Sequence, residues 1–165
     1  MRISCPELAS AVPNAGGLGI LVSADCASGE ELLQEIRKTK SLTDKPFGVN
    51  ISLFPSIEPL PNDEFIEVII DEGIAAVESS GIRGPGEFAE RLRKGNVKLI
   101  HKCAGVRYAQ TAEREGADAV TVVGVENGGA TGMLDITTFV LVPATVNTLS
   151  PNLPQTGQHG GGFGG

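Results

Sequence analysis

Residues 117–132 read Ala-Asp-Ala-Val-Thr-Val-Val-Gly-Val-Glu-Asn-Gly-Gly-Ala-Thr-Gly and change character halfway along. Ala119–Val123 is almost wholly apolar and rich in β-branched residues, which is typical of a strand buried on both faces in a parallel sheet. Glu126–Gly132 has few side chains. Glycines at the carboxyl end of a parallel strand let a ligand approach the backbone N–H groups. Glycine content alone supports a tight turn equally well.

The same pattern of an apolar strand and an amphipathic helix recurs upstream. Strands are expected to begin near residues 18, 47, 74, 97 and 118, and a Ser28-x-x-Glu31 capping box opens one of the helices between them. Pro13 is expected to end the first helix. Successive βα units predict a parallel sheet with crossover helices. A doubly wound sheet and a (β/α)₈ barrel both fit, and both place their chemistry at the carboxyl ends of strands.

Composition narrows the class of protein. The 165 residues include 13 basic and 20 acidic side chains, a net charge of −7, which argues against nucleic acid or an anionic membrane as partner. Neither a membrane-spanning run nor a signal peptide is visible, so a cytoplasmic protein is expected. Cys5, Cys26 and Cys103 are predicted to be reduced and structural. The two histidines, His101 and His159, are far apart, so no metal site is predicted.

The last fifteen residues differ from the rest of the chain. Residues 151–165 are mostly glycine, proline and polar residues without an apolar periodicity. This composition predicts an irregular tail. The expected organisation is therefore a βα-repeat domain over residues 1–150 followed by a tail over 151–165.

Three polar side chains stand at predicted strand ends. Asn50 interrupts an apolar strand, and burying its amide unpaired would cost on the order of 1–3 kcal/mol, so a backbone group or a ligand must satisfy it. Strand alternation places His101 and Lys102 on opposite faces, with Lys102 toward a ligand and His101 toward the helices. Glu126 is open to three interpretations: a general base, a hydrogen-bond acceptor, or a solvated loop acid.

Several stretches, in order from about Ser4 to Thr148, resemble the nitronate monooxygenases, formerly called 2-nitropropane dioxygenases. They are Pro6–Val12, Asn14–Leu21, Asp44–Asn50, Val97–Cys103, and Gly116–Val120 with Gly124–Gly132. The resemblance implies a (β/α)₈ barrel that binds FMN. It implies oxidation of a small-molecule substrate, an alkyl nitronate, by O₂ to a carbonyl compound and nitrite. The related flavin-dependent enoyl-acyl-carrier-protein reductases are the nearest enzymatic alternative.

Carried over residue by residue, the resemblance places Asn50 and Lys102 on the flavin and the loop of Glu126, Gly128 and Gly129 beside its ring. Many family members read Gly-Gly-His in this loop, where the histidine is a catalytic base or orients the substrate. Here that position is Ala130, which cannot accept a proton. No catalytic residue is therefore assigned.

The resemblance also predicts an incomplete barrel. Family members usually begin with a Pro-Met-like strand that this sequence lacks, and Gly161–Gly165 resembles only the start of a phosphate-binding loop. A complete barrel typically takes ~250 residues. Five to six βα units would leave two bare sheet edges, which favours oligomers. An inactive fragment without flavin and a non-redox phosphate-binding barrel, such as an isomerase, remain as alternatives.

Overall fold

The computed structural model of the chain describes residues 3–55, 59–128, 134–150 and 155–157. Strands and helices alternate along all of it. The strands are β1 (Ile20–Val22), β2 (Gly48–Ser52), β3 (Ala76–Ser80), β4 (Lys98–Cys103), β5 (Ala119–Val122) and β6 (Gln155–Gly157). The helices are α1 (Pro6–Asn14), α2 (Gly29–Leu42), α3 (Asn62–Asp71), α4 (Gly86–Lys94), α5 (Val106–Arg114) and α6 (Thr138–Val146).

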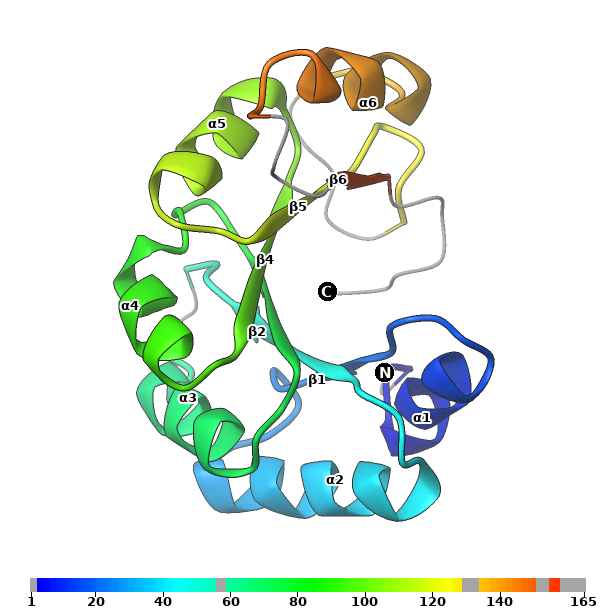
Figure 1. Cartoon of the computed structure of the whole chain (residues 1–165), viewed down its shortest axis with the longest axis vertical. Helices are drawn as coiled ribbons and strands as arrows, with labels where there is room; N and C mark the ends of the chain where they lie inside the picture. The colour runs from blue at the N-terminus through cyan, green and yellow to red at the C-terminus, as the bar shows by residue number, and fades with distance from the viewer. Residues whose placement is uncertain (1–2, 56–58, 129–133, 151–154, 158–165) are drawn as a thin grey trace.

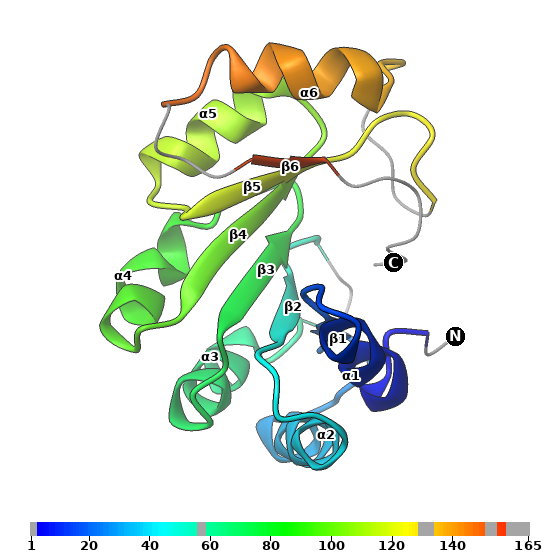
Figure 2. The same cartoon turned by 45° about the vertical axis from the view of Figure 1, so that its right-hand side comes forward.

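The strands form one parallel sheet in the sequential order β1-β2-β3-β4-β5-β6. Helices α2 to α6 follow one another around the outer side of the curved sheet (Figures 1 and 2). A doubly wound sheet reverses its strand order and carries helices on both faces. The tertiary structure therefore selects the barrel architecture, and the predicted incomplete (β/α) barrel is confirmed. Within the described residues the sheet is open between β1 and β6.

The hydrophobic core lies between the sheet and these outer helices. Leu21, Val49, Val77, Leu99 and Val120 occupy one face of successive strands and are almost fully buried. They pack in one cluster with helical side chains that recur at the three- and four-residue spacing of an amphipathic helix, among them Leu32, Ile36, Phe65, Ile69, Phe88 and Leu92. Burying such side chains contributes about 1.5–3 kcal/mol each, so this layer dominates the stability of the fold.

Local signals set several helix ends where the sequence predicts them. The Ser28 hydroxyl accepts a hydrogen bond from the Glu31 N–H at 3.3 Å, and the Glu31 carboxylate accepts one from the Ala27 N–H at 2.8 Å. Gly73, just past α3, has φ +60°, a conformation that favours glycine. Pro13 does not end the first helix, which continues to Asn14. A proline in the final turn removes only one intrahelical hydrogen bond, so the turn persists.

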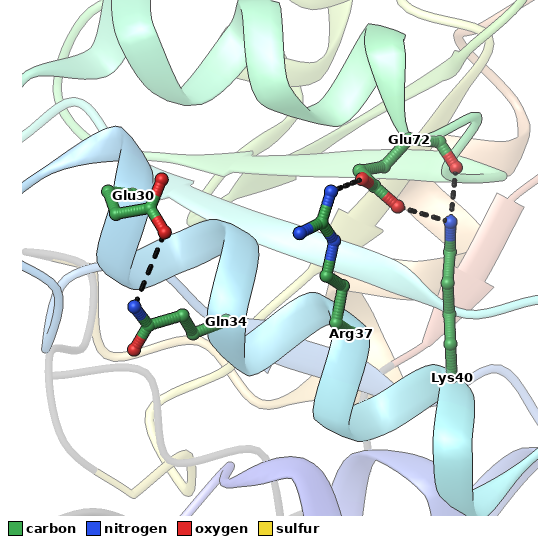
Figure 3. Close-up of polar contacts among 5 residues, drawn as sticks. All are labelled: Glu30, Gln34, Arg37, Lys40 and Glu72. Carbon is green, nitrogen blue, oxygen red and sulfur yellow. Dashed lines mark hydrogen bonds and ion pairs between the residues drawn. The ribbon is translucent and has the colours of Figure 1, made fainter.

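Ion pairs join α2 to α3 on the outer surface. The Glu72 carboxylate lies 2.7 Å from Lys40 Nζ and 3.3 Å from Arg37 Nη2, and Lys40 Nζ also donates to the Glu72 carbonyl at 2.7 Å. Figure 3 shows how the two basic side chains of α2 converge on Glu72. Along α2, Gln34 donates to Glu30 at 3.3 Å. The Lys40 ammonium and the Arg37 guanidinium hold the pKa of Glu72 below its usual range. Pairs this exposed contribute less than about 1 kcal/mol each.

The structure differs from the sequence prediction in the tail. Within the segment expected to be irregular, residues 155–157 form β6, which pairs in parallel with β5 from Val120↔Gln155 to Val122↔Gly157. Backbone hydrogen bonds alone define such a pairing, so it needs none of the apolar periodicity on which the sequence prediction relied. The other tail residues lie outside the described part of the chain.

The remaining expectations from composition concern the cysteines and the membrane. All three cysteines are free in the structure, with Cys26 and Cys103 buried and Cys5 half-buried. Among the described residues, no helix combines the length and apolarity that crossing a membrane requires.

Candidate functional site

The face of the sheet that looks away from the outer helices carries the polar side chains. Residues paired in register across parallel strands point to the same side, and Asn50 pairs with Glu78 while Ser80 pairs with Lys102. Thr121 continues the second row on β5. The alternate positions on the same strands are core residues that are mostly apolar, with the buried Ser79 and His101 among them. The sheet is therefore mainly apolar toward the helices and polar toward the interior of the barrel. These polar side chains run from the middle of the strands, at Asn50 and Glu78, to their carboxyl ends, at Ser80 and Lys102.

Asn50 lies at the centre of this polar face and is only 6% exposed. Its Nδ2 donates to Glu78 Oε2 at 2.9 Å and to Ser80 Oγ at 3.3 Å. The amide is therefore not left unpaired, which removes the desolvation cost of its NH₂ group. Among the described residues, none hydrogen-bonds to its Oδ1. That oxygen is the acceptor left for a ligand.

Lys102 is half-buried on the same face, two strands from Asn50. No described residue forms an ion pair or hydrogen bond with its ammonium group. Its neighbour His101 points the other way: it is 3% exposed and its Nδ1 lies 2.8 Å from Ser79 Oγ. The predicted separation of the two side chains is confirmed. Burial lowers the pKa of His101, so the imidazole is neutral near pH 7.

Glu126 is engaged at the start of α6. Its Oε1 accepts a hydrogen bond from the Thr138 N–H at 2.8 Å and a second one from the Thr138 hydroxyl. A carboxylate at a helix N-terminus satisfies a free N–H group and complements the helix dipole. Of the three interpretations of Glu126, hydrogen-bond acceptor describes these contacts. Contact of Glu126 with a flavin stays a prediction.

The glycine-rich loop is only partly described. Gly128 is exposed, and its carbonyl accepts a hydrogen bond from Asn127 Nδ2 at 2.8 Å. Gly129 and Ala130 lie outside the described residues, so the structure says nothing of their predicted places beside the ring.

Sequence reasoning missed one residue of the polar face, Glu78. The signal was present, because Glu78-Ser-Ser80 interrupts an apolar strand in the way that Asn50 does. Glu78 is half-buried and shares a register position with Asn50. Which of the polar residues on β3 faces Asn50 depends on strand register, and register is a property of the folded sheet.

A separate cavity of about 250 Å³ opens between the starts of α3 and α4. None of the predicted site residues contributes to its walls. It is lined by Leu53, Leu60, Pro61, Asn62, Asp63, Glu64, Arg83, Glu87 and Phe88.

Known proteins resemble this chain over nearly its whole length. The family model for nitronate monooxygenase matches residues 1–157. A (3aS,4S,5R,7aS)-5-hydroxy-7a-methyl-1-oxo-octahydro-1H-indene-4-carboxyl-CoA dehydrogenase of Rhodococcus jostii is 37% identical over 147 residues, covering 89% of this chain and 39% of the relative. A nitronate monooxygenase of Paraburkholderia phytofirmans is 31% identical over 173 residues, covering 83% of this chain and 46% of the relative.

Solved structures agree on the architecture. FabK from Thermotoga maritima superposes with a TM-score of 0.82 at 36% identity, covering 93% of this chain and 46% of that one. A nitroalkane oxidase from Streptomyces ansochromogenes superposes with a TM-score of 0.80 at 25% identity, covering 94% and 55%. The chain thus spans about half the length, or less, of the proteins that it matches.

Proposed function

The chain belongs to the nitronate monooxygenase family, and from this premise we propose that it forms the flavin-facing part of an FMN-dependent oxidoreductase. The observation that carries the proposal is the placement of Asn50 and Lys102. The two side chains come from non-adjacent strands and lie on the polar face of the sheet, Asn50 at the middle of β2 and Lys102 near the carboxyl end of β4. In parallel α/β folds this edge of the sheet is where ligands bind.

The donor set on this face suits a flavin. The isoalloxazine ring presents alternating carbonyl oxygens and ring nitrogens, one of them an N–H, along one edge. The Asn50 Oδ1, to which no described residue donates, can accept from such an N–H. The Lys102 ammonium, which has no partner among the described residues, can donate to a ring carbonyl or balance negative charge on the ring. Because Lys102 forms no hydrogen bond or ion pair with a described residue, contact with the flavin would not require it to break such an interaction.

The proposed reaction is oxidation of an alkyl nitronate by O₂ to a carbonyl compound and nitrite. Bound FMN would supply the electron-transfer chemistry. The protein would hold the ring through Asn50 and Lys102, with the loop of Glu126, Gly128 and Gly129 beside it, and Lys102 would stabilise negative charge nearby. No described side chain is assigned as the base, and Ala130 cannot serve as one.

A second candidate is oxidation or reduction of an acyl thioester on the same flavin site. The dehydrogenase of Rhodococcus jostii, whose name gives a carboxyl-CoA substrate, is 37% identical to this chain, against 31% for the nitronate monooxygenase of Paraburkholderia phytofirmans. An enoyl-acyl-carrier-protein reductase belongs to the same chemical class. Neither activity changes the roles proposed for Asn50 and Lys102.

Two measurements test the proposal in sequence. Titrating FMN into the purified full chain should quench flavin fluorescence and leave a yellow protein after gel filtration. The loaded protein, given propyl-nitronate, should then consume O₂ and release nitrite. Flavin binding without nitrite would favour the thioester candidate, and a colourless protein at saturating FMN would contradict both.

A further inference from the structure

We infer that Glu78 is a positioning residue that holds the Asn50 amide so that its carbonyl oxygen, and not its NH₂ group, is offered to a ligand. The inference rests on the proposed function, in which Asn50 contacts the flavin. It adds a residue from β3 that makes no assumed contact with the ligand itself. Ser80, further along β3 on the same face, supports the same orientation.

The chemistry of the contacts determines which way the amide points. An ionised carboxylate only accepts hydrogen bonds, so the Asn50 atom 2.9 Å from Glu78 Oε2 must be the nitrogen. The Ser80 hydroxyl, 3.3 Å from the same nitrogen, takes the second hydrogen. Turning the amide over would place Oδ1 against the carboxylate oxygen and lose the hydrogen bond to Glu78, whereas the Ser80 hydroxyl could donate to either orientation. The orientation is therefore fixed by Glu78 rather than by the amide's own preference.

This orientation determines what the site can recognise. With both Nδ2 hydrogens used, Asn50 acts only as an acceptor, while the Lys102 ammonium is a donor. Together they match a ligand edge that carries an N–H and a carbonyl or anionic oxygen. An amide already held in the binding orientation loses little rotational freedom when the ligand arrives, which strengthens binding.

The test is a set of variants of the full chain. Glu78→Leu should weaken FMN binding about tenfold, the effect expected when one well-placed hydrogen bond loses its geometry. Glu78→Gln should recover most of the affinity, since its Oε1 can still accept from Asn50. In an Asn50→Leu background, Glu78→Leu should change the dissociation constant by less than about twofold. An equal tenfold loss in both backgrounds would show that Glu78 acts independently of Asn50 and would overturn the inference.

A second readout does not depend on flavin. NMR of the chain without FMN should show slow exchange of the Asn50 side-chain NH₂ hydrogens with water in the wild type and in Glu78→Gln. In Glu78→Leu these NH₂ hydrogens should exchange about tenfold faster, because their hydrogen bond to the carboxylate is lost. The backbone resonances should keep their dispersion, which shows that the variant is still folded. Unchanged exchange rates would overturn the positioning role even if FMN binds. Failure of the wild type to bind FMN would instead overturn the proposed function and leave the exchange rates to decide on Glu78.

Discussion

The Nδ1 atom of His101 lies 2.8 Å from the Ser79 hydroxyl, and both side chains are buried on the helix-covered face of the sheet. The residues that follow them, Ser80 and Lys102, are also register partners, and they face the interior. Two adjacent pairs on the same two strands therefore have different roles. One pair belongs to the core and the other to the candidate site.

The buried imidazole predicts an acid-sensitive fold. Burial lowers the pKa of His101 from its ordinary 6.5. Between the folded and unfolded pKa values the unfolded chain binds more protons than the folded protein, so stability is full above about pH 6.5 and falls as the pH decreases through that interval. Urea unfolding should show that the wild type loses more stability between pH 8 and pH 5 than His101→Gln does. Equal losses in the two proteins would contradict this assignment.

Lys102 should matter for flavin binding and little for stability. Lys102→Met is expected to weaken FMN binding about tenfold to a hundredfold, since hydrogen bonds from charged groups are worth about 1.5–3 kcal/mol. The melting temperature of the variant should equal that of the wild type within measurement error, because Lys102 forms no hydrogen bond or ion pair with a described residue. Fluorescence titration and thermal unfolding measure the two effects.

Lys98→Met is the matched control for that variant. Lys98 stands on the same strand and the same face as Lys102 but at the opposite end, where it pairs with Asp118 at 2.9 Å. Its removal should leave FMN affinity unchanged. A similar loss of affinity in both variants would point to net charge rather than to a specific contact of Lys102.

Glu126 should contribute to stability through α6. Glu126→Ala removes the acceptor for the Thr138 N–H and hydroxyl and should lower the free energy of unfolding by about 1 kcal/mol. Glu126→Gln, which keeps one acceptor oxygen, should lose less. Chemical denaturation of the two variants measures the difference, and identical stabilities in all three proteins would argue against the capping role.

The thiols should differ in reactivity. Burial raises the pKa of the Cys103 thiol to about 12, so at pH 8 almost no thiolate is present. Ellman's reagent should label one thiol, Cys5, in the native protein and the other two only after denaturation. Cys5→Ser should abolish the native labelling. Rapid labelling of Cys103 in that variant would show that the sheet opens around β4.

The order and type of the elements could be predicted because they depend on local patterns. Ala119–Val122 is a strand because β-branched residues without polar alternation fit a strand covered on both sides. Ser28 and Glu31 begin a helix through contacts only three residues apart. The side preference of Lys102 and His101 follows from strand alternation alone. Each of these predictions uses information within a few residues of the chain.

Other features depend on contacts between distant residues. The choice of a barrel over a doubly wound sheet depends on which face each helix covers. The pairing of Asn50 with Glu78 depends on the register of β2 against β3, and the capping of α6 by Glu126 depends on how the loop after β5 folds back. β6 forms by backbone pairing with the edge of β5, and no side-chain pattern in the sequence predicts this pairing.

For this protein the sequence by itself determined the βα repeat, the faces of individual strands and the polar residues at their ends, because backbone geometry and hydrophobic periodicity are local. Only the tertiary structure decided that the polar residues of different strands share one face and that Glu78 orients Asn50. It also decided that Lys102 forms no hydrogen bond or ion pair with a described residue. Hydrogen bonds and ion pairs act over a few ångströms in space, whatever the separation in sequence, so their partners are known only once the sheet has a register.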